Sequence, residues 1–110
     1  MCNRKWKYEE FNDLETLNQY NLALKYGIEE EKAQKIVQNH SRDNARTPMQ
    51  WNHEIYAGFS NKKPWMPVNE NYKTVNVEDK QKEYGSILNF YKRLIAFRKS
   101  DEYKKRFNVR

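Results

Sequence analysis

Two arginines near the middle of the chain are the side chains best suited to binding chemistry. Arg42 and Arg46 stand four residues apart in the stretch SRDNARTPMQW, residues 41–51. A guanidinium presents a rigid fork of N–H donors that suits carboxylates and vicinal hydroxyls. If a helix or short turn continues through both arginines they share one face, and Pro48 then forces the chain out of the helix. The stretch therefore predicts an arginine at the edge of a cleft. The alternative is a structural ion-pair network of Arg42, Asp43 and Arg46.

Other common site chemistries find little support in the sequence. His40 and His53 are thirteen residues apart, with no CxxC or HExxH arrangement beside them. The chain has three glycines, too few for a glycine-rich phosphate loop, and its single cysteine, Cys2, stands in the N-terminal segment. We therefore assign no catalytic residue, no metal ligand and no cofactor from the residues alone.

The composition indicates a piece of a larger structure. The chain has 110 residues, of which 37% are apolar and 33% charged, and its mean hydropathy is −1.23. Such a polar chain has difficulty building a core of its own at this length. Yet it carries eight Tyr, five Phe and three Trp, side chains in which disordered segments are poor. Few aliphatic and many aromatic residues suit a chain whose core is completed by partner surfaces.

Charge and cysteine content bear on partners and location. No apolar run reaches the roughly 18 residues of a membrane span, and no signal peptide is visible, so we expect no membrane partner. One cysteine allows no internal disulfide, and a cytoplasmic setting is expected. The net charge of +6 includes a basic cluster of Lys104, Lys105, Arg106 and Arg110. This charge keeps open an alternative of another class, a small basic helical protein that binds nucleic acid or another protein. Because the basic residues are spread among acidic ones, however, we expect nucleic acid not to be a partner.

Hydrophobic spacing predicts a mainly helical chain. We expect helices near residues 12–26, 29–46 and 86–100, with little or no strand. Residues 47–82 are expected to form a long loop. The aromatic residues in this segment predict that the loop is ordered and packed, and residues 72–77 could form a short extended piece.

Helix boundaries are indicated by capping residues. Asn12 and Glu15 are spaced as a capping box at the start of the first helix, and Gly27 is suited to ending it. Ser86 is a good N-cap for the last helix. A wide apolar face follows it, made of Ile87, Phe90, Tyr91, Leu94, Ile95 and Phe97.

These residues resemble one enzyme family. Besides SRDNARTPMQW, the resemblance rests on DLETLN at 13–18, AGF at 57–59, PW at 64–65, VNENY at 68–72, VNV at 75–77 and the last helix. The family is the α-glucosidase branch of glycoside hydrolase family thirteen, within the α-amylase superfamily, which includes oligo-1,6-glucosidase, dextran glucosidase and trehalose-6-phosphate hydrolase. The resemblance implies a (β/α)8 barrel, with residues 1–110 as the segment after the last strand plus the last barrel helix.

The resemblance also implies a function and one site residue. It suggests hydrolysis of α-1,6-glucosidic bonds at the non-reducing ends of short isomalto-oligosaccharides, with trehalose-6-phosphate hydrolase or dextran glucosidase as alternatives. Arg46 corresponds to the arginine that binds hydroxyls of the α-glucoside, Arg42, Asp43 and Asn44 would hold its loop, and Trp51 would pack beneath it. The family's nucleophile, acid/base residue and C-terminal β-domain have no counterpart here. We therefore expect the chain to be inactive alone and, without the barrel, partly disordered or aggregating.

Overall fold

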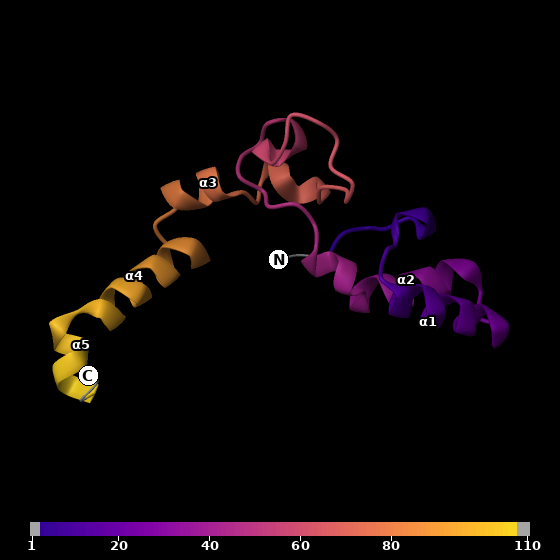
Figure 1. Ribbon diagram of the computed structural model, residues 1–110, viewed down its shortest axis with the longest axis horizontal. Helices are drawn as coiled ribbons and strands as arrows, with labels where there is room; N and C mark the ends of the chain where they lie inside the picture. Colours follow the sequence, from indigo (N-terminus) through magenta and orange to yellow (C-terminus); the bar gives the residue numbers. More distant parts are fainter. Residues whose placement is uncertain (1–2, 108–110) are drawn as a thin grey trace.

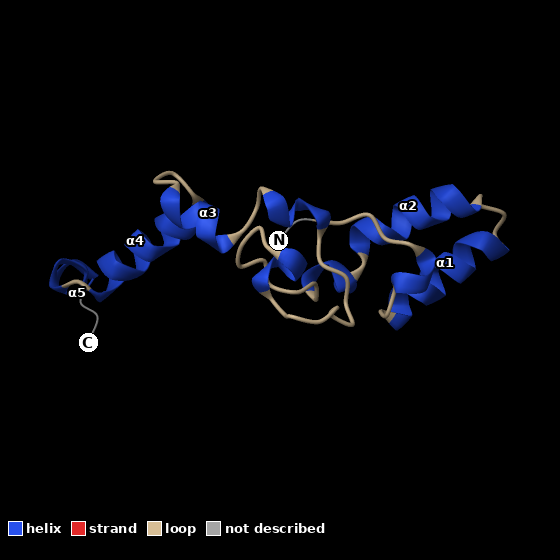
Figure 2. Ribbon diagram, turned by 90° about the horizontal axis from the view of Figure 1, so that it is seen from above, coloured by secondary structure: helices blue, strands red, loops and turns tan. Residues whose placement is uncertain are grey.

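The computed structural model describes residues 3–107, so Cys2 and Arg110 lie outside the described part. Within it every regular element is a helix and no strand occurs (Figure 2). Five α-helices and four 3-10 turns follow one another: η1 (Tyr8–Glu10), α1 (Leu14–Lys25), α2 (Glu30–His40), η2 (Arg42–Ala45), η3 (Ile55–Gly58), η4 (Glu70–Lys73), α3 (Val77–Lys82), α4 (Ile87–Lys99) and α5 (Asp101–Phe107). The expectation of helices around one long loop is confirmed.

The helices form an open, elongated arrangement. The molecule measures 60 × 36 × 21 Å and its radius of gyration is 19.5 Å, whereas a compact domain of about 100 residues has one near 13 Å. In Figure 1, α1 and α2 lie side by side at one end, and the long loop winds back on itself in the middle. Helices α3, α4 and α5 extend away from it as an arm. A chain of this shape leaves much of its apolar surface uncovered.

The buried core lies at the α1–α2 end. Side chains from both helices, from the N-terminal segment and from the loop meet there: Trp6, Phe11, Tyr20, Ala33, Val37 and Met66. Gly27, with φ of +80°, ends α1 in a Schellman motif, since the Gly27 N–H donates to the Leu24 carbonyl and the Ile28 N–H to that of Ala23. The predicted helix stop is thereby confirmed, and the turn brings α2 back along α1.

Two predicted helix boundaries are wrong. The N-cap of α1 is Asp13 rather than Asn12, and its side chain makes no capping hydrogen bond because its carboxylate is bound to Arg42 and Thr16. The second helix was expected to reach residue 46, but α2 ends at His40. Ser41 is extended, with φ −61° and ψ 132°, and a separate 3-10 turn follows.

The long loop is held by asparagine caps and backbone pairing rather than by buried aromatic rings. The extended piece expected at residues 72–77 is absent, because Asn76 caps α3 by accepting the Asp79 N–H at 2.9 Å. The N–H groups of Val77 and Glu78 donate to the carbonyls of Gln50 and Trp51, both at 3.0 Å. The prediction of packed loop aromatics is wrong for Trp51, Phe59 and Trp65, which are 49%, 48% and 79% exposed.

Three consecutive residues of the loop form a left-handed turn. Tyr56, Ala57 and Gly58 have φ of +52°, +57° and +66°. This conformation costs roughly 1–2 kcal/mol for a residue with a Cβ atom. The buried carbonyl of Ala57 accepts the N–H groups of both Trp51 and Asn52, at 2.9 and 3.2 Å. The strained turn therefore closes the loop onto the C-terminal end of the arginine stretch.

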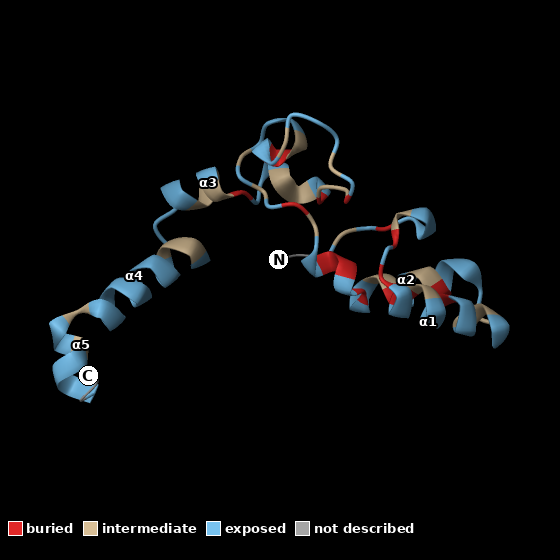
Figure 3. Ribbon diagram, in the orientation of Figure 1, coloured by how far each residue is buried: buried red, intermediate tan, exposed pale blue. Residues whose placement is uncertain are grey.

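The last predicted helix is confirmed as α4, and a further helix follows it. Ser86 caps α4 by accepting the Asn89 N–H at 3.2 Å. The charged segment after Lys99, which showed no apolar pattern, forms α5, where Ser100 accepts the Tyr103 N–H at 3.3 Å. Both α4 and α5 are largely exposed (Figure 3).

Candidate functional site

The arginine stretch is fastened to the start of α1 by an ion pair between the buried Asp13 and Arg42, whose side chain is 60% exposed. The Arg42 Nη2 and Nε groups donate to Asp13 Oδ1 at 2.7 and 3.1 Å, and Thr16 Oγ1 donates to Asp13 Oδ2 at 2.9 Å. The hydrogen bond from Arg42 lowers the pKa of Asp13 from 3.8 to about 2, and the same bond raises the pKa of Arg42. Asp13 is thus a permanent carboxylate and no candidate for a general acid at neutral pH.

Asp43 is the central acceptor of the stretch. Its side chain is fully buried. Oδ2 accepts the backbone N–H groups of Asn12 and Asp13 at 2.7 and 2.9 Å, and Oδ1 accepts Arg46 Nη1 at 3.2 Å. These donors compensate a buried carboxylate for its lost hydration. Asp43 therefore ties the helix start to Arg46.

Asn44 joins the same stretch to the N-terminal segment. Its Oδ1 accepts the indole N–H of Trp6 at 2.8 Å and the backbone N–H of Arg4 at 3.2 Å. Its Nδ2 donates to the carbonyls of Gln38 and Ser41, at 2.7 and 3.1 Å. With four hydrogen bonds the amide is saturated. The expectation that Arg42, Asp43 and Asn44 hold the loop is confirmed.

Arg46 is held at one end and exposed at the other. Asp43 fixes its Nη1 group, and 46% of the Arg46 side chain remains exposed. The expectation that Arg42 and Arg46 share one face is wrong, because Arg42 turns to Asp13 on α1 while Arg46 turns to Asp43. Both arginines thus take part in ion pairs, as the structural alternative supposed, but with different partners. Trp51, which was expected to pack beneath the turn, is 49% exposed.

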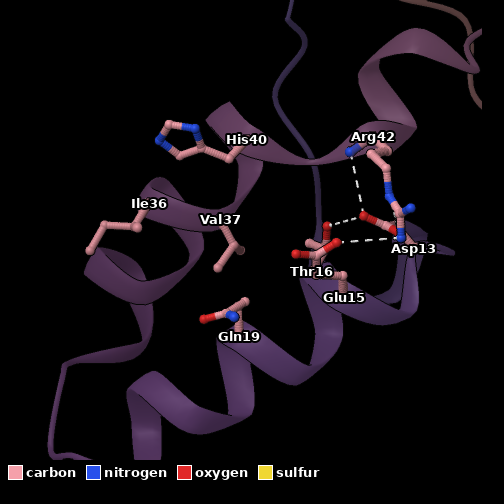
Figure 4. Close-up of a pocket in the computed structure, with 8 residues that line it drawn as sticks. All are labelled: Asp13, Glu15, Thr16, Gln19, Ile36, Val37, His40 and Arg42. Carbon is pink, nitrogen blue, oxygen red and sulfur yellow. Dashed lines mark hydrogen bonds and ion pairs between the residues drawn. The ribbon is translucent and has the colours of Figure 1, made fainter.

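A cavity of about 320 Å³ lies between α1 and α2 beside this network (Figure 4). It is lined by Asp13, Glu15, Thr16, Gln19, Ile36, Val37, His40 and Arg42. Arg46 is not among the lining residues. Within residues 3–107 no cluster of His, Cys, Asp or Glu could hold a metal ion, and no helix is long and apolar enough to cross a membrane.

Sequence reasoning missed two residues that build this site. Asp13 was assigned to a helix start, although an acid directly before an apolar helix can also serve as an ion-pair partner for a distant arginine. Trp6 stands before the first predicted helix and was given no role, yet it is 3% exposed and its indole N–H donates to Asn44. The aromatic spacing of Trp6 and Phe11 was the available signal that this segment packs onto a core.

The chain matches known proteins along most of its length. Residues 8–106 match the family model of the alpha amylase catalytic domain. The alpha-glucosidase of Candida albicans is 47% identical over 94% of this chain and 19% of its own length. The oligo-1,6-glucosidase of Bacillus cereus is 43% identical over 86% of this chain and 17% of its own length.

A solved structure shows the same arrangement of elements. The crystal structure of Bacillus licheniformis trehalose-6-phosphate hydrolase superposes with a TM-score of 0.82 and 41% identity, covering 90% of this chain and 18% of the hydrolase. These matches confirm the expected resemblance and the fold class, a mainly helical part of a (β/α)8 barrel. This chain, which spans less than a fifth of the length of each of these relatives, belongs to the alpha-amylase family.

Proposed function

We propose that this chain is part of a glycoside hydrolase of the oligo-1,6-glucosidase type. The activity would be hydrolysis of α-1,6-glucosidic bonds at the non-reducing ends of short isomalto-oligosaccharides, in the cytoplasm. Support comes from relatives that carry this name, among them the Bacillus cereus enzyme. The chain's own contribution is a substrate-binding loop, residues 41–51.

Arg46 is the residue that we propose contacts the sugar. The observation that carries this is a guanidinium held by a buried carboxylate at 3.2 Å while 46% of its side chain faces solvent. Fixing one nitrogen reduces the conformational entropy lost when the others bind a ligand. The remaining N–H groups, which have no partner within residues 3–107, have the fork geometry that suits adjacent hydroxyls.

We propose that the catalytic carboxylates lie on other elements of the (β/α)8 barrel. A retaining glycosidase needs two carboxyl groups about 5–5.5 Å apart across the scissile bond. In this chain the two buried carboxylates of the network, Asp13 and Asp43, are both bound to arginines. Residues 1–110 then correspond to the segment after the last barrel strand, with α4 as the last barrel helix. The chain alone should not turn over substrate.

Two neighbouring substrates are kept as alternatives because specific relatives favour them. A trehalose-6-phosphate hydrolase superposes with a TM-score of 0.82, and a glucan 1,6-alpha-glucosidase from Streptococcus dysgalactiae is 40% identical. The alternatives differ in the group attached to the glucose, so an assay on all three substrate types separates them.

The test is a transplanted segment. Residues 8–106 replace the matching part of the Bacillus cereus enzyme, and kcat/KM is measured on isomaltose, dextran ends and trehalose 6-phosphate. Arg46→Ala removes charged hydrogen bonds worth about 1.5–3 kcal/mol, so kcat/KM should fall roughly 10- to 150-fold. Ala45→Ser, beside it in the same turn, is the matched control and should change kcat/KM by less than about 3-fold.

Two results would count against the proposal. Turnover of isomaltose by the 110-residue chain alone would show that the carboxylates are present after all. A transplanted enzyme that keeps its kcat/KM after Arg46→Ala would remove Arg46 from the binding site.

A further inference from the structure

A second pocket lies between the N-terminal segment, α1 and α2. Its volume is about 560 Å³. Three elements supply its lining, which includes Tyr8 and Glu9 of η1, Tyr20 and Leu24 of α1, and Glu30 and Gln34 of α2. Neither Arg42 nor Arg46 lines it. The pocket therefore has its own set of functional groups, to which the arginine stretch contributes none.

The Tyr20 hydroxyl opens into this pocket without a hydrogen-bond partner. Tyr20 is 8% exposed, and its ring packs in the core and against Tyr8, with 4.7 Å between the ring centroids. Within residues 3–107 the hydroxyl makes no hydrogen bond, and the one fully buried side-chain nitrogen or oxygen without a partner there is Arg4 Nε. The Tyr20 hydroxyl therefore keeps accessible surface on the pocket side. A tyrosine hydroxyl that is this deeply placed usually finds a partner, so the group is suited to receiving a ligand.

The polar groups around this hydroxyl are mostly acceptors. The carboxylates of Glu9 and Glu30 form no ion pair within the described part of the chain. Gln34 donates its Nε2 group to the Trp6 carbonyl, which leaves Oε1 as the open end of the amide. Burial raises the pKa of the Tyr20 hydroxyl, and the negative charge of Glu30 raises it further, so that carboxylate lies near enough to act on the hydroxyl. The pocket thus offers a ligand more acceptors than donors.

The charge of the pocket favours a cationic ligand. One basic and two acidic side chains line it, Lys7, Glu9 and Glu30, which gives a net charge of −1 in a chain of net charge +6. An anion would meet like charge, and a neutral sugar would leave the excess negative charge uncompensated. A bare metal ion would need a third acidic, histidine or cysteine ligand, and residues 3–107 contain no such group of three. An organic cation fits these groups best.

Apolar surface beside the acceptors defines the rest of the ligand. Leu24 and the ring of Tyr8, which is 36% exposed, line the same pocket. A cation near a tyrosine ring gains a cation–π attraction, and a short hydrocarbon stem gains from burial against Leu24. An ammonium group combines a compact charge with three hydrogen-bond donors. A primary alkylammonium therefore matches both the polar and the apolar part of the lining.

We propose that this pocket binds a primary alkylammonium group. The ammonium donates to the Tyr20 hydroxyl oxygen, to the Glu30 carboxylate and to Gln34 Oε1, while the stem lies against Tyr8 and Leu24. The site requires neither Arg46 nor glucosidase activity, so it stands or falls separately from the proposed function.

The experiment follows the methyl signals of two leucines of α1 by NMR. Leu24 lines the pocket and Leu22 does not. Both are observed in the full 110-residue chain and in the transplanted enzyme. n-Butylammonium should shift the Leu24 signals saturably and leave those of Leu22 unchanged. n-Butanol, which has the same stem without the charge, and isomaltose should produce no saturable shift up to about 100 mM.

Three variants assign the contacts. Tyr20→Phe keeps the ring and removes the hydroxyl, so the affinity for n-butylammonium should fall roughly 10-fold. The thermal stability should not fall, because the hydroxyl has no partner within the described residues. Glu30→Gln should weaken binding roughly 5-fold. Glu31→Gln, the next residue of α2 and outside the lining, is the matched control and should change the affinity by less than about 2-fold.

Two carriers of the ammonium group are compared, a free amine and a lysine side chain. Tighter binding of n-butylammonium than of Nα-acetyl-lysine amide supports the site and assigns it to a free amine. The reverse order supports the site and assigns it to the lysine of a protein.

Four results overturn the proposal. They are an equal response to n-butylammonium and n-butanol, saturable binding of isomaltose in place of the amine, a Tyr20→Phe variant that keeps the full affinity, and Leu24 signals that n-butylammonium leaves unshifted in the transplanted enzyme. The last result decides if the isolated chain does not fold. Saturable amine binding by a transplanted enzyme without glucosidase activity supports this site and counts against the proposed function.

Discussion

The two ends of this molecule differ in how their residues are stabilised. The α1–α2 end buries six apolar side chains and surrounds Asp13, Asp43 and Asn44 with donors. The arm of α3, α4 and α5 contains no buried apolar residue and is joined by caps and surface hydrogen bonds. The same short chain therefore contains one region with a buried core of its own and another whose apolar side chains stay exposed.

The comparison also explains where the binding residue lies. Arg46 belongs to the self-contained end, where a buried acceptor orients it, because a ligand-binding fork must be held in place before the ligand arrives. The wide apolar face of α4 belongs to the arm, where its large side chains stay 42–77% exposed even though the Phe97 ring contacts Tyr103 of α5. Substitutions of the same kind at the two ends should therefore have very different effects on stability.

The largest difference in stability is expected between substitution of a buried acid and substitution of an exposed one. Asp43→Ala leaves the backbone N–H groups of Asn12 and Asp13 without their acceptor, and each buried donor left unsatisfied costs about 1–3 kcal/mol. Asp101→Ala in α5 removes an exposed pair with Lys104 at 3.5 Å and should cost less than about 0.5 kcal/mol. Urea unfolding followed by hydrogen exchange in α1 and α2 measures both. Equal small effects would mean that the buried network does not stabilise its end.

Truncating one aromatic ring at each end sharpens the contrast for apolar contacts. Phe11 is 6% exposed and Phe90 is 53% exposed. Phe11→Ala should lower the free energy of unfolding of the α1–α2 end by about 3–5 kcal/mol, while Phe90→Ala should change the isolated chain by less than about 1 kcal/mol. The free energy of unfolding of both variants is then measured in the transplanted enzyme, where Phe90→Ala should become strongly destabilising. A Phe90→Ala effect that is small in both settings would contradict the assignment of α4 as a buried helix of the whole domain.

Acidification should weaken the α1–α2 end selectively. The folded pKa of Asp13 is about 2 against an ordinary 3.8, so its stabilisation is present above pH 4 and is lost as pH falls from about 4 to 2. The difference corresponds to about 2 kcal/mol. Asp13→Asn should be less stable at pH 7 and should flatten this part of the pH profile. An unchanged pH profile in the Asp13→Asn protein would show that another group carries the dependence.

The smallest expected effect concerns the loop between the two ends. At Gly58 the φ of +66° disfavours any side chain, and a Cβ atom there would lie 2.5 Å from Asn52 Oδ1. Gly58→Ala should therefore destabilise the loop by about 1–2 kcal/mol. Gly85→Ala, where a Cβ atom would meet nothing within 4 Å, is the control and should be neutral or slightly stabilising. Proteolysis rates of residues 49–65 measure the difference.

Local patterns predicted the helices well because their signals are local. Ser86 and the 3.6-residue apolar spacing indicate α4 directly, and Gly27 ends α1 as expected. The end of α2 was predicted wrongly because Ser41 does not continue the helix. Its hydroxyl accepts the Asp43 N–H and caps the following 3-10 turn instead. The left-handed Tyr56 and Ala57 have no local signal, since neither is a glycine or asparagine.

Partners far apart in sequence could not be assigned from spacing. The pair of Asp13 and Arg42 joins residues 29 positions apart, and that of Trp6 and Asn44 joins residues 38 apart. The sequence supplied the residue types for Arg46 and its motif, but only the fold shows that Asp43 holds it.

Hydrogen exchange of the full chain alone, and of the same residues within the transplanted enzyme, tests the account most directly. Alone, the amides of α1 and α2 should exchange slowly and those of α4 rapidly, because an unsupported 13-residue helix is marginal in water. Within the transplanted enzyme, the amides of α4 should gain protection from exchange comparable to that of α2. Protection of α4 in the isolated chain equal to that of α2, and unchanged within the transplanted enzyme, would contradict the division into a self-contained end and an arm that lacks stabilising contacts of its own.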